Sequence, residues 1–245
     1  MRELIFPKEI EQILRQIPEE YSSYFKEYFQ TAPDKVLEAM TLETRKVNRI
    51  LVEENDRIEK VYVLLEGRVR AVDFRVKGAS YEFAHFGPVT LLGSMECMFE
   101  LDHYATTLVT DSACTMVSIP KALFESWLKT NPVAMQKEAL SMRSYLLDYT
   151  RESRVMMMLN GTERLIYLLT RMCEMQGQRE EYLLAVNRQE LAEQSGSSVK
   201  TVNRSMKKLE ESDMVLRVGH KVKVTQSQYS AMKEYLGGIL NYTSK

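Results

Sequence analysis

The segment Asn187–Glu210, with the sequence NRQELAEQSGSSVKTVNRSMKKLE, constrains the fold of this 245-residue chain more than any other. Asn187 lies three residues before Glu190, which is the spacing of a capping box at the start of a helix. Gly196 readily adopts a positive φ angle and so predicts a tight turn after that helix. Ser198 is a suitable N-cap for a second helix. The segment therefore predicts two helices joined by a short turn.

Three residues of this segment have the spacing of a helix-turn-helix motif. A small residue, Ala192, is followed four positions later by Gly196 and six positions after that by Val202. The small side chain allows the two helices to cross closely, and we expect Val202 to fill the space between them.

The second helix of the motif has a positively charged surface. Residues 199–208 include four Lys or Arg residues and no Asp or Glu. Lys200, Asn203, Arg204 and Lys207 recur at helical spacing on the face expected to point outward. Long cationic side chains beside an Asn are suited to neutralising phosphates and reading bases in the major groove. A solvated face without a partner is the alternative, but the agreement of caps, turn and charge favours nucleic-acid binding.

The basic character extends over the whole C-terminal region. Residues 215–224 alternate around Gly219, which predicts a β-hairpin wing with basic residues that contact the DNA backbone. Residues 187–245 contain ten Lys and Arg and six Asp and Glu, a net charge of +4. Because the whole chain carries −1, the preceding residues carry −5. The net charge of the whole chain is nearly zero because a basic C-terminal region and an acidic remainder almost cancel.

Residues 46–119 have the pattern of an all-β unit. Short runs rich in Val, Ile, Tyr and Thr alternate with turn signals that include Gly67 and Gly78, both suited to positive φ. Strands at this spacing are typical of a sandwich or barrel. The expected strands are Val47–Val52, Lys60–Leu65, Val69–Phe74, Tyr81–Phe86, Thr106–Thr110 and Cys114–Ile119.

Helical spacing dominates on both sides of this β unit. Aromatic residues after Pro18 predict an amphipathic helix that packs on a core (Tyr21, Tyr24, Phe25, Tyr28 and Phe29). Lys121–Thr130 predicts a short helix, and Asn131-Pro132 predicts the start of a long one. Asn160 and Glu163 have capping-box spacing for a further helix. Its expected apolar face is Leu165, Leu168, Leu169, Met172 and Met175.

The long helix carries a heptad seam that we expect to form a dimer interface. Its members are separated alternately by four and three residues: Met135, Ala139, Met142, Leu146, Tyr149, Ser153 and Met156. A seam along about 24 residues, roughly 35 Å of helix, needs a partner surface. A second copy of the chain is the expected partner, and burial within the monomer is the alternative.

These features together resemble the Crp/Fnr superfamily of bacterial transcription regulators. The resemblance is strongest over residues 187–210 and the hairpin after them. Further landmarks are Glu66-Gly67, Leu92-Gly93, Asn131-Pro132, Thr162-x-Arg164 and Arg188-Gln189-Glu190. The resemblance implies an α+β fold with a jelly-roll-like β-roll (double-stranded β-helix) sensor domain over residues 1–132. A dimerisation helix over 133–159 and a C-terminal winged helix-turn-helix domain over 160–245 complete it.

The resemblance also implies a function. It predicts a homodimeric, sequence-specific DNA-binding transcription regulator, with a pseudo-palindromic double-stranded operator and RNA polymerase as partners. The sequence shows no Gly-rich phosphate loop, metal-ligand cluster or nucleophile–base arrangement, so we expect no enzymatic activity.

In this family, the residue matching Arg188 holds a DNA phosphate, and those matching Val199, Lys200, Asn203 and Arg204 face base edges. Arg204 stands where the family usually has an arginine that reads guanine. Lys200 replaces a frequent glutamate and cannot accept a hydrogen bond from a cytosine amino group, so we expect a different recognition sequence. The expected DNA-binding residues are Arg188, Ser198, Val199, Lys200, Thr201, Asn203, Arg204, Lys207 and Lys208.

The sensor region departs from the cyclic-nucleotide-binding members of the family. Those members place a glutamate for the ribose, and an arginine and a serine for the cyclic phosphate, where this chain has Ser94, Tyr104 and Ala105. Residues 93–107 contain no Lys or Arg. A buried phosphate without a cation is poorly compensated. We therefore expect an effector other than cyclic AMP, and no cofactor or metal.

We expect the effector to bind between the β-roll and the long helix. The candidate lining is mostly apolar with a few hydroxyls, which suits a hydrophobic or aromatic ligand. It comprises Leu92, Gly93, Ser94, Met95, Tyr104, Ala105, Thr106, Met142, Leu146, Tyr149 and Thr150. Core packing explains the same residues, so a constitutive regulator with a vestigial pocket is one alternative. A signalling module that acts through protein contacts is another.

Other sensing chemistries have less support in the sequence. The N-terminal cysteine cluster of iron–sulfur members is missing, since the first cysteine is Cys97. A thiol sensor (Cys97, Cys114 or Cys173) and a haem ligand (His85 or His103) stay as alternatives, although a buried cysteine usually acts as a small hydrophobe.

The composition also indicates where the protein functions. Three cysteines without a CxxC pair indicate a reducing compartment. The sequence shows no signal-peptide core and no apolar run approaching 18 residues, so we expect a cytoplasmic protein without membrane contact.

Overall fold

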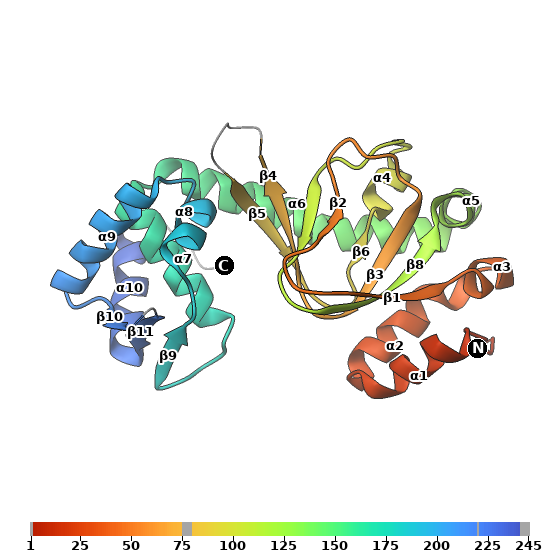
Figure 1. Cartoon of the computed structure of the whole chain (residues 1–245), viewed down its shortest axis with the longest axis horizontal. Helices are drawn as coiled ribbons and strands as arrows, with labels where there is room; N and C mark the ends of the chain where they lie inside the picture. The colour runs from red at the N-terminus through yellow and green to blue at the C-terminus, as the bar shows by residue number, and fades with distance from the viewer. Residues whose placement is uncertain (1, 75–79, 220, 241–245) are drawn as a thin grey trace. The chain divides into compact units, whose positions relative to one another are not determined.

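The computed structural model describes residues 2–74, 80–219 and 221–240, apart from the side chains of residues 144, 145, 148, 149 and 151–153. The chain forms two compact units (Figure 1). The first comprises Met1–Asp73 and Glu82–Asp148, and the second Phe74–Tyr81 and Tyr149–Lys245. Each unit has its own hydrophobic core.

The first unit is built on two antiparallel four-stranded sheets, as the predicted β-roll requires. One sheet has the order β1-β8-β3-β6 and the other β2-β7-β4-β5. The strands are β1 Thr41–Arg45, β2 Ile50–Val52, β3 Lys60–Glu66, β4 Val69–Asp73, β5 Tyr81–Phe86, β6 Leu91–Leu92, β7 Thr107–Thr110 and β8 Cys114–Pro120.

The six expected strands are all present, with one marked change of boundary. The run predicted as Val47–Val52 forms a strand only from Ile50, because Asn48 adopts a positive φ of 55° in a turn. Gly67 has the expected positive φ of 93°, whereas Gly78 lies outside the described residues. Strands β1 and β6 escaped prediction, since β1 is mostly polar with no fully buried residue and β6 has two residues.

The central strand β3 is buried on both faces. Tyr62 and Leu64 contribute to the core that the strands of the two sheets form between them. Val61, Val63 and Leu65 point the other way, into a core shared with helices. This double burial explains why β3 reads as a continuous apolar run rather than an alternating one.

Six short helical segments accompany the sheets in the described part of this unit. They are α1 Lys8–Gln16, α2 Glu19–Tyr28, η1 Phe29–Thr31, α3 Asp34–Glu38, α4 Ser94–Met98 and α5 Lys121–Thr130. The aromatic residues Phe25, Tyr28 and Phe29 are buried, and the ring of Trp127 in α5 lies 5.4 Å from that of Phe29. The aromatic helix after Pro18 therefore packs on the core as predicted.

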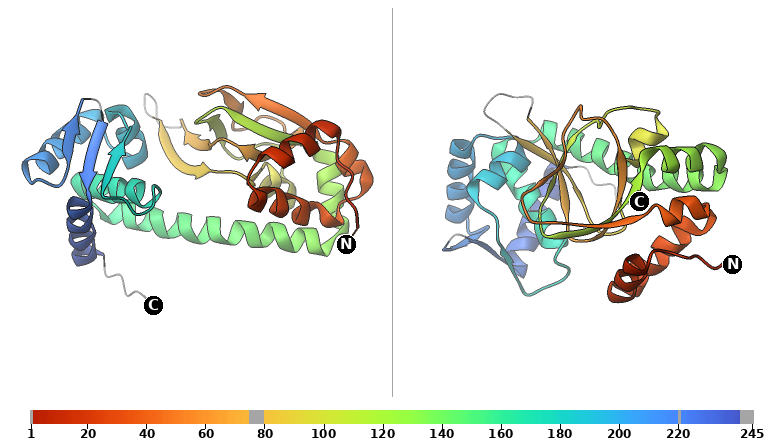
Figure 2. Two further views of the ribbon diagram at one scale, coloured as in Figure 1. Left: turned by 90° about the horizontal axis from the view of Figure 1, so that it is seen from below. Right: turned by 45° about the vertical axis from the view of Figure 1, so that its right-hand side comes forward.

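Helix α6, Pro132–Met158, is one uninterrupted helix (Figure 2). Its burial corrects part of the predicted seam. Met142 and Met156 are only 7% and 8% exposed, and Met156 belongs to the core of the second unit. Met135 packs partly buried against the core of the first unit. Side chains that their own chain buries cannot face a partner helix. Two further predicted seam residues, Tyr149 and Ser153, are among those whose side chains are not described.

The exposed apolar residues of α6 fall elsewhere. Ala139 and Leu146 are exposed, as the predicted seam requires. Val133, Leu140 and Leu147, each seven residues after the last, are also exposed, at 49%, 52% and 62%. The heptad repeat is therefore present, but its exposed face is centred one residue away from the expected one.

The second unit contains α7 Gly161–Glu174, β9 Glu181–Leu184, α8 Arg188–Ser195, α9 Val199–Glu211, β10 Leu216–Val218, β11 Lys221–Thr225 and α10 Gln226–Ile239. Its sheet has the order β10-β11-β9. The capping box of Asn160 and Glu163 starts α7 as predicted. Met175, expected on the apolar face of α7, is instead 72% exposed, because the helix ends at Glu174.

Candidate nucleic-acid interface and sensor site

Helices α8 and α9 begin and end as their sequence indicates. The Asn187 side chain accepts a hydrogen bond from the Glu190 backbone N–H at 2.9 Å, and the Glu190 carboxylate accepts one from the Asn187 N–H at 2.9 Å. Gly196, with φ of 60°, ends α8. The Ser198 hydroxyl then accepts from the Thr201 N–H at 3.1 Å and starts α9. These local bonds fix the geometry of the turn.

The two helices are held together by their apolar faces. Ala192 and Leu191 from α8 are buried against Val202, which is fully covered. Met206 and Leu209 continue the buried face of α9. Val202 thus fills the space between the helices, as the motif spacing predicts.

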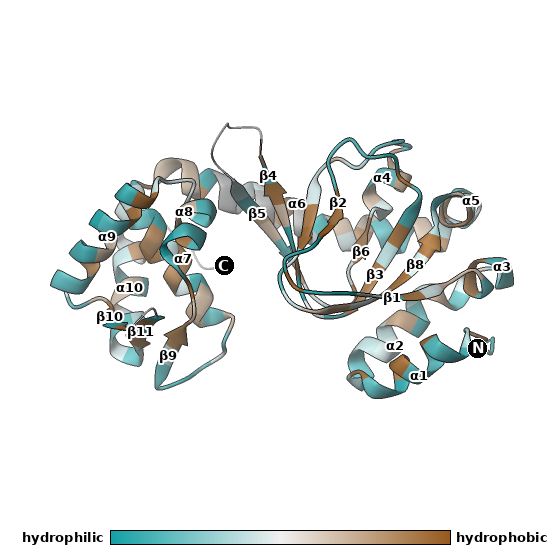
Figure 3. Ribbon diagram, in the orientation of Figure 1, coloured by the Kyte–Doolittle hydropathy of each residue, from teal (hydrophilic) through white to brown (hydrophobic). Residues whose placement is uncertain are grey.

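The opposite face of α9 is exposed and basic. Lys200, Asn203, Arg204, Lys207 and Lys208 are all exposed, and the helix is largely hydrophilic in Figure 3. Within the described residues, Lys200, Arg204 and Lys208 form no ion pair, and Lys207 lies 3.7 Å from Glu211. The structure thus brings most of the predicted DNA-binding side chains onto one surface. The remaining α9 candidates sit at its N-terminus, where Ser198 and Val199 are exposed and Thr201 is half-buried.

Arg188 has a different environment. Its guanidinium lies 3.5 Å from the carboxylate of Glu210, and both side chains are about one-third exposed, at 29% and 33%. Burial lowers the pKa of Arg188. The pair joins the first turn of α8 to the last part of α9, so Arg188 is already engaged with a carboxylate.

A β-hairpin follows α9. Strands β10 and β11 pair in antiparallel register around Gly219, whose φ is 60°. Leu216 and Val218 are exposed, whereas Val222 and Val224 are buried against the core of the unit. Strand β11 therefore packs the wing against the core, and strand β10 is exposed.

The candidate sensor residues are largely engaged within the chain. Gly93 adopts a positive φ of 87° at the start of α4, and a Cβ there would lie 3.1 Å from the Tyr104 ring. The Tyr104 hydroxyl donates to the Lys60 carbonyl at 2.6 Å, and burial raises the pKa of this phenol. Leu92 and Ser94 are buried. Ala105, Leu146 and Thr150 are exposed, and Met95 and Thr106 are half-buried.

Two buried carboxylates in this region were not anticipated from the sequence. Glu96 is 5% exposed and accepts a hydrogen bond from the Ala105 N–H at 3.2 Å. Glu138 is 1% exposed and accepts from the hydroxyls of Ser94 at 2.5 Å and Tyr28 at 2.6 Å. Burial raises the pKa of Glu138. From the sequence alone, an acidic residue on a helix is predicted to be exposed to solvent. Its burial becomes evident only when its distant hydrogen-bond partners are known.

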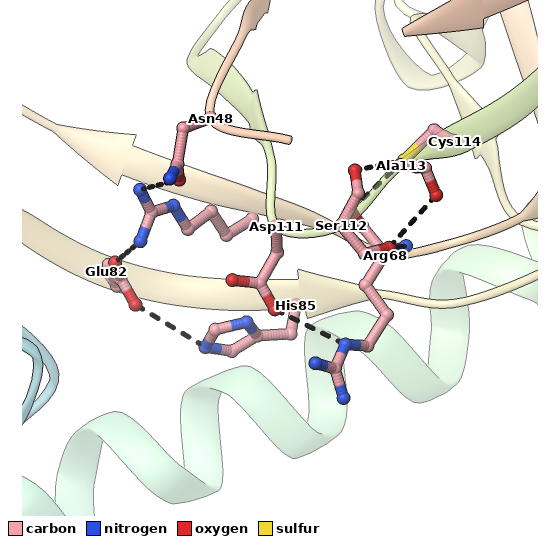
Figure 4. A network of polar contacts seen from close by, with 9 residues as sticks. Asn48, Arg68, Glu82, His85, Asp111, Ser112, Ala113 and Cys114 are labelled. Atoms are coloured by element: carbon pink, nitrogen blue, oxygen red, sulfur yellow. Dashed lines mark hydrogen bonds and ion pairs between the residues drawn. The ribbon is translucent and has the colours of Figure 1, made fainter. Parts of the chain in front are cut away.

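A network of polar contacts on the β-roll includes His85, one of the two candidate haem ligands (Figure 4). Glu82, with a side chain only 2% exposed, pairs with Arg70, which also contacts Asn48 at 3.4 Å. The Nε2 of His85 lies 3.9 Å from the other Glu82 oxygen. Nearby, Arg68 lies 3.3 Å from Asp111. His85 therefore faces a carboxylate.

The three cysteines are free thiols buried in three different cores. Burial raises the pKa of Cys97 and of Cys173 to about 12, and it also raises the pKa of Cys114. Thiols with such values stay protonated near neutral pH and react slowly. Their environment fits the small-hydrophobe interpretation.

The described residues contain no group of three or more His, Cys, Asp or Glu side chains placed to hold a metal ion. No helix within them is both long and apolar enough to cross a bilayer.

Comparisons with known proteins agree with both units. Residues 43–131 match the family model of the cyclic nucleotide-binding domain, and residues 163–234 match that of the Crp-like helix-turn-helix domain. A comparison with curated protein sequences found no match.

Solved structures share the fold at low sequence identity. The c-di-GMP responsive global regulator CLP of Xanthomonas campestris is 20% identical, with 83% of this chain and 99% of that chain covered and a TM-score of 0.72. A putative transcriptional regulator of the Crp/Fnr family from Eubacterium rectale is 12% identical, with 91% and 97% covered and a TM-score of 0.69. FixK2 from Bradyrhizobium japonicum is 15% identical, with 80% and 96% covered and a TM-score of 0.63.

Proposed function

Because this chain belongs to the Crp/Fnr superfamily of transcription regulators, we propose that it binds a specific double-stranded operator as a homodimer. The exposed face of α9 carries this proposal. It presents Lys200, Asn203, Arg204 and Lys207 without an acidic residue among them, on a helix whose cap and buried face fix its position. Such a surface suits major-groove reading and phosphate neutralisation.

The operator is expected to be a pseudo-palindrome. Two copies of α9, related by the two-fold axis of the dimer, would enter successive major grooves about one helical turn apart. Arg204 has the reach and donors for a guanine edge, and Lys200 favours an acceptor such as guanine over the cytosine amino group. RNA polymerase is the expected protein partner, and the cytoplasm is the expected location.

The exposed stripe of α6 supports the homodimer. Val133, Leu140 and Leu147 lie seven residues apart, with Leu146 beside them, and all are exposed in the single chain. This is the spacing with which two parallel helices interlock. A second copy of the same helix is a complementary partner because the same stripe faces itself across a two-fold axis.

The proposed effector is not a cyclic nucleotide. Glu96 and Glu138 are buried in the region where the family binds its ligand, and residues 93–107 provide no Lys or Arg. A cyclic phosphate there would lie beside buried carboxyl groups, with no cation to compensate its own charge. An uncharged, largely apolar ligand is compatible with this chemistry. It would act by shifting the population of domain arrangements that bind DNA.

A constitutive regulator is the second candidate. Ser94, Glu96 and Tyr104 already have hydrogen-bond partners within the chain, so the region is satisfied without a ligand. The two candidates differ in whether a bound molecule changes the affinity for DNA. A structure of the protein purified from its native host distinguishes them by what the sensor region holds.

Operator selection from a random duplex library tests the main proposal. Fluorescence anisotropy on the selected duplex should show an affinity that falls steeply with salt. Arg204→Ala should cost about 1–3 kcal/mol and relax one position of the site. Lys233→Ala, which removes an exposed cation of α10 paired with Glu174 at 3.4 Å, is the matched control. Salt-independent binding, or equal affinity of Arg204→Ala and wild type, would overturn the proposal.

A further inference from the structure

A cavity of about 420 Å³ opens beside α9 in the second unit. Its lining comes from three places in the sequence: the first residues of α7, one side of α9, and Tyr235 of α10. The cavity therefore depends on α10, which follows the wing and lies outside the helix-turn-helix motif.

The α7 side of the cavity is fixed firmly against α9. A Cβ at Gly161 would lie 2.9 Å from the Thr201 methyl group, so only glycine allows this approach without a shift. The Thr162 and Ser205 hydroxyls are 3.0 Å apart in a hydrogen bond between the helices. Asn160 caps α7 by accepting from the Thr162 N–H at 3.0 Å. This wall of the cavity is preorganised.

The lining has the chemistry of an anion site. Arg204 and Lys208, one helical turn apart, both line it, and neither forms an ion pair within the described residues. Tyr235 also lines it and is 41% exposed. No Asp or Glu belongs to the lining. The start of α7 adds the positive end of a helix dipole.

We propose that this cavity holds a backbone phosphate of the operator, with Lys208 and the Tyr235 hydroxyl donating hydrogen bonds to its oxygens. The inference rests on the proposed DNA-binding function and deepens it. A duplex phosphate is favoured as the occupant because the cavity adjoins the face of α9 that carries Lys200 and Asn203. DNA lying along that face would carry its sugar–phosphate strand past the rim of the cavity. The C-terminal helix then adds a contact that the helix-turn-helix and its wing do not provide.

Conservative tyrosine variants of the full-length protein test the inference. Tyr235→Phe removes only the hydroxyl and should weaken binding to the selected operator by about threefold to tenfold per half-site. Tyr229→Phe is the matched control on the same helix, since its hydroxyl donates to Glu174 at 3.3 Å and lies outside the cavity lining. It should bind as wild type. Lys208→Ala should reduce the slope of log affinity against log salt by about one.

A chemical scan of the DNA locates the contact. Operators with one phosphate replaced by a neutral methylphosphonate are titrated with wild type and Tyr235→Phe. At one phosphate in each half-site, the replacement should lower the operator affinity of wild type. At that same phosphate, wild type and Tyr235→Phe should then bind with equal affinity, as expected if the hydroxyl and the phosphate contact each other. If no replaced phosphate reduces that difference, or if Tyr235→Phe matches Tyr229→Phe, the inference is wrong while DNA binding itself stands. If wild type shows no salt-dependent binding to any duplex, the proposed function fails, and this inference with it.

Discussion

The hydroxyl of Tyr28 donates a 2.6 Å hydrogen bond to the carboxylate of Glu138, a residue 110 positions later in the chain. Both side chains are buried, at 2% and 1% exposure. The Ser94 hydroxyl donates to the other carboxylate oxygen. Glu138 thereby connects α6 to both α2 and α4 within the first unit. A buried carboxylate with two neutral donors is stable only while both donors are in place.

Removing one donor should destabilise the first unit. Tyr28→Phe leaves one oxygen of Glu138 without a partner, which should cost about 1–3 kcal/mol of unfolding free energy. Urea unfolding followed by circular dichroism measures the change. Tyr24→Phe, on the same helix but 43% exposed, should change stability very little. If the two substitutions lowered the unfolding free energy equally, the Tyr28 hydrogen bond would not contribute specifically to stability.

The same carboxyl should make stability depend on pH. Burial raises the pKa of Glu138 in the folded state above the ordinary value of 4.5 for a glutamate, so folding favours the protonated form. Its contribution is fully present below about 4.5 and is lost as pH rises through the higher folded pKa. Glu138→Gln cannot titrate. The difference in unfolding free energy between wild type and Glu138→Gln should therefore move against wild type as pH rises from about 4.5 toward neutrality. A difference that stays constant over this range would contradict the assignment.

The pair of Arg188 and Glu210 should limit DNA affinity. The Glu210 carboxylate competes with a DNA phosphate for the same guanidinium at 3.5 Å. Glu210→Gln should therefore bind the operator roughly twofold to fivefold more tightly at low salt. Glu234→Gln on α10 makes the same change in charge and controls for the general field of the domain. Arg188→Ala should weaken binding. Anisotropy titrations in which Glu210→Gln and Glu234→Gln behave alike would rule out the competition.

Two glycines of the second unit should respond in opposite ways to alanine. Gly196 has φ of 60°, and a Cβ there would meet no atom closer than 3.7 Å, so the cost of Gly196→Ala is conformational, about 1–2 kcal/mol. Gly237 lies in α10 in open space. Gly237→Ala should stabilise the protein by roughly 0.5–1 kcal/mol by restricting the unfolded chain. Thermal unfolding of both variants checks the signs, and a stabilising Gly196→Ala would refute the turn geometry.

The proposed dimer depends on the exposed stripe of α6. Leu140→Glu or Leu147→Glu would bury an unpaired charge between two copies of the helix, raising the dimer dissociation constant more than about 100-fold. Analytical ultracentrifugation at several concentrations measures this constant. Met175→Glu is the control, because Met175 is 72% exposed and lies outside α6. A Leu140→Glu protein that remains as dimeric as the control would exclude this face.

Local sequence patterns predicted the elements whose stability is decided by neighbouring residues. The capping boxes at Asn160 and Asn187, the turn at Gly196 and the N-cap at Ser198 all form as expected. Each depends on bonds between residues at most a few positions apart, so the order of residue types is sufficient. The elements that escaped prediction carry weak local signals. Strand β9 is short, and its partner β11 lies about 40 residues away.

The chain's sequence by itself determined the caps, the motif, the basic face of α9 and the alternation of the β-roll strands. Only the tertiary structure decided which face of α6 stays exposed, because the heptad periodicity does not show that Met142 and Met156 are buried. It also decided that Glu138 is buried and that Tyr235 lines a cavity with Lys208. Burial, charge pairing and cavities arise from contacts between residues far apart in the chain. Local propensity cannot specify those contacts, because folding selects them from many alternatives.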